Sequence, residues 1–105
     1  MTIVHYCPSS YALTVAGHAG AARRGEDLVC AGLSTLCWGL KRAVEAVPGY
    51  GAVGQVDENG PRFTLRCRPS LRLRGRCRAV LEAAAAGFGL LAEEFPDYVK
   101  LEVER

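Results

Sequence analysis

The pattern of apolar and polar positions changes along the chain, and each pattern predicts one kind of element. Residues 2–6 and 11–16 are short runs rich in β-branched and aromatic side chains, separated by the turn formers of 7–10. This arrangement predicts an opening β-hairpin. Residues 17–25 are small and glycine-rich and follow neither the strand nor the helix period, so we expect a loop there.

A helical period follows the loop. From Leu28 onward apolar residues return every three or four positions, which predicts a helix over about 28–47. Asp27 is a suitable N-cap, because a carboxylate there can accept one of the unpaired backbone N–H groups of the first turn. Pro48 and Gly49 supply the stop signal.

The second half of the chain contains a second hairpin, a second helix and a last strand. Residues 51–57 and 62–68 flank an Asn59-Gly60 pair, which favours the turn of a second hairpin. In 62–68 apolar residues alternate with arginines, so one face of this strand should be buried and the other solvated. We expect a second helix over about 76–95 and a last strand over about 99–103.

The predicted order is β-β-α-β-β-α-β, which indicates an α+β fold. We expect a single domain over residues 1–105, built as a two-layer α/β sandwich of a mainly antiparallel sheet with both helices on one face. A chain of 105 residues builds one compact core.

Composition narrows the location and the chemistry. No apolar run approaches the roughly 20 residues that cross a bilayer, and residues 1–5 lack the features of a secretory signal, so we expect a soluble, cytoplasmic protein. The five cysteines are odd in number and lack Cys-x-x-Cys spacing, which favours reduced thiols over disulfides or a structural metal. We expect no metal and no cofactor.

The positive charges are unevenly placed, although the net charge is only +2. Seven of the thirteen Lys and Arg residues fall within 62–78. This segment is a candidate RNA contact, because arginine pairs with phosphate and stacks on bases. The alternative is an ordinary solvated strand face and loop.

Cys30 is the candidate nucleophile. Counted from a cap at Asp27, it is the third helical residue, where unpaired N–H groups and the positive end of the helix dipole favour a thiolate. Those N–H groups are also candidates for an oxyanion hole. The alternative is a small buried thiol.

His18 and Ser34 complete the candidate site. His18, in the loop before the helix, is a candidate general base for the thiol. Ser34 follows Cys30 by four positions and should lie on the same helix face, where it either orients the thiol or the substrate or bonds back to its own backbone. We expect the other four cysteines, Cys7, Cys37, Cys67 and Cys77, to be inert.

Residues 17–34 resemble the signature of the ribosomal-processing cysteine proteases, the Prp family. They match the pattern G-H-A-x5-G-x-D-x-V-C-A-x-x-S at all nine specified positions. On this resemblance Cys30 is the nucleophile and His18 the base. The other motif positions fall on Asp27, Ser34, Gly17, Ala19 and Gly25, and the glycine-flanked loop 19–24 would move when substrate enters.

The resemblance implies a homodimeric cysteine endopeptidase that removes a short N-terminal extension from a large-subunit ribosomal protein. It implies no cofactor and no membrane partner. Two departures from the family pattern lie outside the motif: the arginines of 71–76, where acidic residues are usual, and Gly32, where alanine is usual. The rival hypothesis is a non-catalytic ribosome- or RNA-binding module that uses the arginine-rich segment 62–78.

Overall fold

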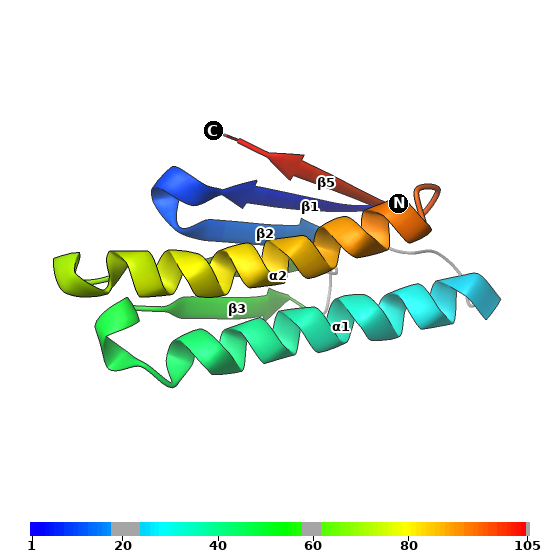
Figure 1. Cartoon of the computed structure of the whole chain (residues 1–105). Helices are drawn as coiled ribbons and strands as arrows, with labels where there is room; N and C mark the ends of the chain where they lie inside the picture. The colour runs from blue at the N-terminus through cyan, green and yellow to red at the C-terminus, as the bar shows by residue number, and fades with distance from the viewer. Residues whose placement is uncertain (18–23, 58–61, 105) are drawn as a thin grey trace.

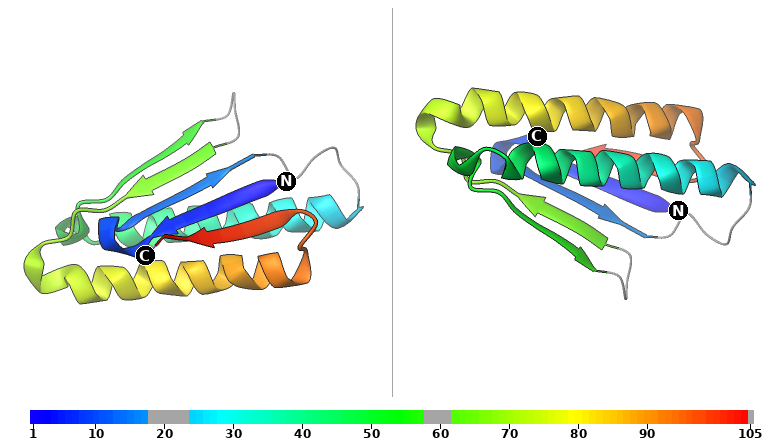
Figure 2. Two further views of the ribbon diagram at one scale, coloured as in Figure 1. Left: turned by 90° about the horizontal axis from the view of Figure 1, so that it is seen from above. Right: turned by 90° about the horizontal axis from the view of Figure 1, so that it is seen from below.

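The computed structural model describes residues 1–17, 24–57 and 62–104. Five strands and two long helices lie in these ranges, and neither helix is long and apolar enough to cross a membrane. In chain order they are β1 (Thr2–Cys7), β2 (Ala12–Ala16), α1 (Arg24–Glu45), β3 (Val53–Asp57), β4 (Arg62–Arg66), α2 (Arg74–Glu94) and β5 (Val99–Val103). Figure 1 labels all of them except β4, which lies beside β3 in Figure 2. Short 3-10 turns at Pro8–Ser10 (η1), Pro48–Tyr50 (η2) and Leu71–Leu73 (η3) connect several of them.

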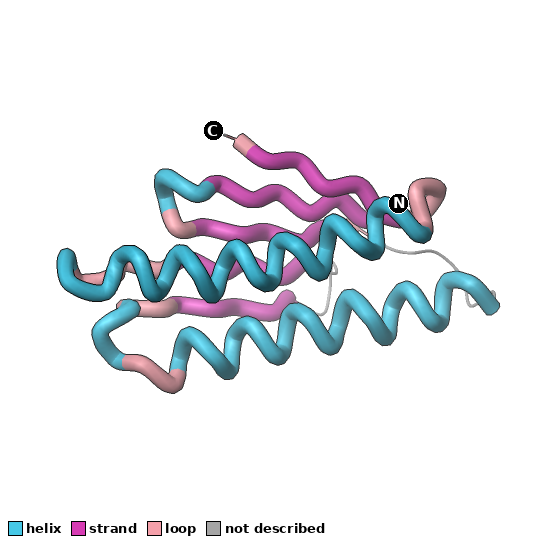
Figure 3. Tube along the Cα trace, in the orientation of Figure 1, coloured by secondary structure: helices cyan, strands magenta, loops and turns pink. Residues whose placement is uncertain are grey.

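The strands form one sheet in the order β3-β4-β2-β1-β5. β1 pairs with β5 in parallel, and the other three pairs are antiparallel. Both helices cover the same face of this sheet, as Figures 2 and 3 show. The predicted two-layer α+β fold and its element order are therefore confirmed.

The core lies between the sheet and the helix layer. Alternate strand residues point to the helices, so the period-2 pattern of β1, β2 and β4 becomes one apolar surface. α1 and α2 each cover it with a stripe at helical spacing, and a fully buried leucine or valine contributes about 1.5–3 kcal/mol. The stripe of α1 consists of Val29, Leu33, Cys37, Leu40 and Val44, and that of α2 of Cys77, Leu81, Ala85 and Phe88.

Two glycines let the helices approach closely. A Cβ on Gly87 of α2 would lie 2.8 Å from a methyl of Leu36, and one on Gly32 of α1 would lie 3.2 Å from a methyl of Leu91. Each helix therefore receives a leucine of the other at a position without a side chain. This packing gives Gly32 and Gly87 a structural role, despite a helix-propensity cost of about 1 kcal/mol for each glycine.

The bounds of α1 differ from the prediction. The helix begins at Arg24 instead of near 28, so Asp27 is its fourth residue and the prediction of Asp27 as the N-cap is wrong. Residues 24–27 contain no proline that would stop a helix, and Arg24 and Glu26 favour one although Gly25 does not. It ends before Val47, which is extended because Pro48 follows it.

Candidate active site

One flank of α1 carries the candidate nucleophile. Cys30 is exposed, Ser34 follows four positions later and is also exposed, and Trp38, four positions further, is 54% exposed. Residues four apart on a helix stand one above the other, with Cβ atoms about 5–6 Å apart. Cys30, Ser34 and Trp38 thus form a row along α1, which we call the Cys30 row.

The Cys30 row faces away from α2 and toward the outer strand β3. Lys41 lies eleven positions after Cys30, which at 100° per residue places it on nearly the same side of the helix. The side-chain carbons of Lys41 pack 3.2 Å from where Gly54 of β3 would carry a Cβ. Its Nζ lies 5.9 Å from the centre of the Trp38 ring and 2.9 Å from Oε1 of Glu45. These contacts hold the Trp38 end of the row in place.

The helix-start explanation for Cys30 is wrong. Because α1 begins at Arg24, Cys30 is its seventh residue and lies about 9 Å along the axis from the first. The unpaired N–H groups belong to the first four residues, and the dipole effect fades within the first turn. Neither those amides nor the dipole therefore acts on the Cys30 sulfur.

Ser34 keeps its hydroxyl available. In this part of α1 the hydroxyl that bonds back to the helix belongs to Thr35, whose Oγ1 donates to the carbonyl of Ala31 at 2.8 Å. Within the described residues Ser34 makes no such bond. The expectation of Ser34 one turn from Cys30 on the same face is thus met by the helix geometry, and its hydroxyl is free to donate or accept.

Three of the other thiols are buried, and Cys7 is not. Burial raises the pKa of Cys37 and of Cys67 to about 12, and it also raises the pKa of Cys77. Cys7 is half-buried, and its Sγ lies 3.5 Å from the hydroxyls of Ser9 and Ser10, which lower its pKa. All five cysteines are free thiols. Accessible sulfur is therefore found at Cys30 and at Cys7.

Gly17 has a structural reason to be glycine. It ends the described segment after β2 with a φ of +107°, and a Cβ there would collide with the carbonyl oxygen of Met1. A side chain would be excluded on both grounds. Of the remaining motif residues, Gly25 is the second residue of α1, whereas His18 and Ala19 lie outside the described residues, as does most of loop 19–24.

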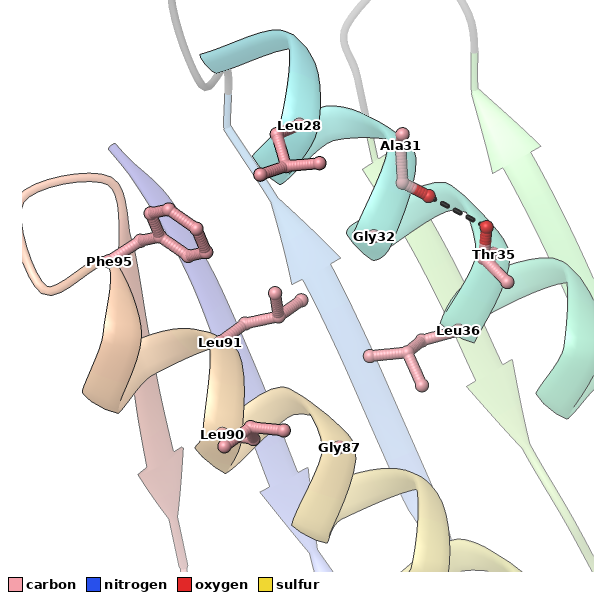
Figure 4. Close-up of a pocket in the computed structure, with 9 residues that line it drawn as sticks. All are labelled: Leu28, Ala31, Gly32, Thr35, Leu36, Gly87, Leu90, Leu91 and Phe95. Carbon is pink, nitrogen blue, oxygen red and sulfur yellow. Dashed lines mark hydrogen bonds between the residues drawn. The ribbon is translucent and has the colours of Figure 1, made fainter. Parts of the chain in front are cut away.

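An apolar groove lies on the other side of α1. Figure 4 shows it between α1 and α2, with a volume of about 460 Å³. Leu28 lines it, and since two helix positions are 200° apart, Cys30 points nearly the opposite way. The groove is therefore separate from the Cys30 row. Its lining consists of Leu28, Ala31, Gly32, Thr35, Leu36, Gly87, Leu90, Leu91 and Phe95.

Sequence reasoning missed Trp38 and Lys41. The signal was present, because Trp38 continues the four-residue spacing of Cys30 and Ser34. An exposed tryptophan gives this flank an apolar surface beside polar groups, which suits the backbone and side chains of a peptide. An exposed thiol on such a flank defines a candidate thiol hydrolase.

Comparison with known proteins identifies the class and the family. The model of the family described as cysteine protease Prp matches residues 2–100. The chain therefore belongs to the Prp family of cysteine proteases. The ribosomal processing cysteine protease Prp of Bacillus subtilis (strain 168) is 26% identical over 87 residues, which are 81% of this chain and 78% of that protein.

Solved structures show the same fold. A ribosomal processing protease Prp from S. aureus, crystallised with a covalently linked product peptide, has a TM-score of 0.82 and 21% identity, and covers 99% of this chain and 100% of its own. SMU.848 from Streptococcus mutans has a TM-score of 0.76 and 25% identity, and the match covers 97% of this chain and 90% of SMU.848.

Proposed function

We propose that this cysteine protease removes a short N-terminal extension from a large-subunit ribosomal protein, with Cys30 as nucleophile and His18 as base. The observation that carries the proposal is the exposure of Cys30 within a fully matched family motif, while Cys37 on the same helix is buried. The names of the Bacillus subtilis and S. aureus relatives supply the substrate class.

The proposed chemistry is acyl transfer. His18 takes the thiol proton of Cys30, the thiolate attacks the scissile carbonyl, and His18 returns the proton to the leaving amine. Water then hydrolyses the acyl-enzyme, which frees Cys30. Since the first-turn amides of α1 are too far along the helix, the Ser34 hydroxyl is our candidate donor to the sulfur or to the developing oxyanion. Asp27, no longer a cap, stands three positions before Cys30 and is our candidate for orienting His18.

The dyad is tested on the extended ribosomal protein as substrate. Cys30→Ala and His18→Ala should each abolish cleavage, whereas the control variants Cys7→Ala and Cys67→Ala should still cleave. Cleavage by Cys30→Ala at the wild-type rate would overturn the assignment. Asp27→Asn tests whether Asp27 acts on His18 through a hydrogen bond or through its charge. Asparagine can still accept a hydrogen bond but lacks the charge that stabilises a protonated histidine.

The proposal includes a homodimer that acts in the cytoplasm, where ribosomal proteins are made. The apolar groove between α1 and α2, with exposed Leu28 and Leu90 at its sides, supports a second copy packing there. Sedimentation should give a dimer for the wild type and for Leu71→Arg, an exposed leucine at η3, and a monomer for Leu90→Arg. A wild-type monomer at micromolar concentration would contradict the dimer.

A further inference from the structure

Charge is strongly segregated in this molecule. Residues 62–78 contain seven arginines and no acidic residue, so this segment carries +7; since the whole chain carries +2, the remainder carries −5. All seven side chains are exposed. We call them the arginine band: Arg62, Arg66, Arg68, Arg72, Arg74, Arg76 and Arg78.

The band begins at Arg62, which pairs in register with Ala16 of β2, and runs along β4 toward the end of the molecule where α2 starts. Arg62 and Arg66 alternate with the buried Phe63 and Leu65 of β4, so they project from the sheet face that no helix covers. The band continues through η3 into the first turns of α2. Figure 1 shows η3 and the start of α2 at the end of the molecule opposite the first turns of α1.

In the part of the chain that the structure describes, these arginines form no salt bridge, although Arg78 and Glu82 both lie near the Tyr6 hydroxyl. The two salt bridges found within residues 1–17, 24–57 and 62–104 are His5–Glu104 and Lys41–Glu45, and neither involves the band. The first turn of α2 has no acidic residue and no side-chain cap, so its arginines face both each other and the positive end of the helix dipole. Arginines placed in this way destabilise the isolated chain, and an anion bound from outside would relieve their repulsion.

We propose that the arginine band is an RNA-docking surface. Guanidinium groups pair bidentately with phosphates, and such contacts hold a protein on a nucleic acid without reading its sequence. RNA is favoured over an anionic membrane because the band turns from the sheet face to α2, whereas a bilayer presents a plane. A membrane-bound segment also needs several apolar anchors, and within 62–78 Leu71 is the one large apolar side chain that is strongly exposed.

The band would let the enzyme dock on a substrate that is already assembled with RNA. This consequence rests on the proposed function, since it concerns which form of the ribosomal protein is cut. The η3 and α2 part of the band lies at the end opposite the first turns of α1, so docking through this part leaves Cys30 accessible. Cleavage of RNA-bound substrate should then fall with rising salt, while cleavage of a short free peptide should not.

Direct binding tests the band without any cleavage assay. Fluorescence anisotropy of a labelled RNA hairpin should show binding that weakens steeply between 50 and 200 mM salt, with each lost phosphate contact lowering the salt slope by about one. Arg72→Gln/Arg74→Gln should weaken binding about tenfold. The matched control, Arg24→Gln/Lys100→Gln, removes two cations from elements that start at the opposite end and should change binding less than about twofold.

Several results would overturn the RNA surface: no binding at 50 mM salt, equal loss in both double variants, or tighter binding to phosphatidylserine vesicles than to the hairpin. Cleavage reports separately on the proposed function. The Arg72→Gln/Arg74→Gln variant should cut a free peptide at the wild-type rate but cut RNA-bound substrate more slowly. If the wild type cuts neither, the proposed function fails while the anisotropy result still decides the RNA surface.

Discussion

The two sides of α1 carry similar residues in opposite situations. Cys30 is exposed on the outer flank, whereas Cys37, seven positions later, is 8% exposed and packed in the core. Neighbours divide in the same way, since Leu33 is buried and Ser34 is exposed. One helix therefore builds the core with one side and displays chemistry with the other. Substitutions on the two sides should separate stability from activity.

The largest contrast should appear in thiol reactivity. With a pKa of about 12, Cys37 is only about one part in 10⁴ thiolate at pH 8, whereas an ordinary thiol near 8.5 is about one quarter ionised. Native Cys37 should therefore react with iodoacetamide about 10³-fold more slowly than an ordinary accessible thiol, and Cys30 is the exposed thiol of α1 against which it is compared. Mass spectrometry of peptides after timed labelling measures the ratio.

The labelling experiment needs Cys7 removed, because Ser9 and Ser10 lower the pKa of its thiol and it should react early. In Cys7→Ser protein, Cys30 should be the first cysteine modified, and unfolding in urea should make all the remaining thiols react at similar rates. Equal labelling of Cys30 and Cys37 in the native protein would contradict the division of α1 into two sides.

Adjacent truncations should show the next largest contrast. Leu33→Ala removes a buried side chain and should lower the free energy of unfolding by about 2–5 kcal/mol. Ser34→Ala removes an exposed hydroxyl and should change it by less than about 0.5 kcal/mol, while slowing cleavage. Urea unfolding and peptide cleavage measure the two effects. A stable but fully active Ser34→Ala enzyme would remove Ser34 from the mechanism.

This division of α1 also explains what the sequence could predict. The helical period of Val29, Leu33, Leu40 and Val44 predicted the buried side correctly, because burial imposes a pattern on every turn. The start of the helix had no such pattern. Asp27 has the chemistry of a cap, and only the observed helix shows that the chain is already helical at Arg24.

The sequence predicted which residues form the candidate site, but not which backbone charges lie near the Cys30 sulfur. Cys30 and Ser34 were found by spacing and by the family motif, and both lie on the exposed flank. The earlier helix start removes the first-turn amides from the Cys30 sulfur, which no local pattern indicated. Trp38 was missed because an aromatic at helical spacing usually belongs to a core, and its exposure depends on where β3 and Lys41 lie.

Alkaline pH should destabilise the buried side of α1. The pKa of Cys37 is raised from 9.0, its ordinary value, to about 12 in the fold, so its contribution is complete below pH 9 and is lost as the pH rises toward 12. At pH 10 this loss is about 1–2 kcal/mol. Cys37→Ala should therefore lose about 1–2 kcal/mol less than the wild type between pH 8 and 10 in urea unfolding. Parallel losses in the two proteins would contradict it.

The smallest effect should come from Gly39 of α1, which lies nine positions after Cys30 and therefore on the opposite side of the helix. This glycine is exposed in mid-helix, and a Cβ there would meet no atom within 4 Å, unlike a Cβ on Gly87, which would press on Leu36. Gly39→Ala should therefore raise the free energy of unfolding by about 0.5–1 kcal/mol through helix propensity alone. Gly87→Ala is the matched control, because the same propensity gain is opposed by the clash with Leu36. Equal stabilisation by both substitutions would show that the helices do not approach as closely at Gly87 as the structure places them.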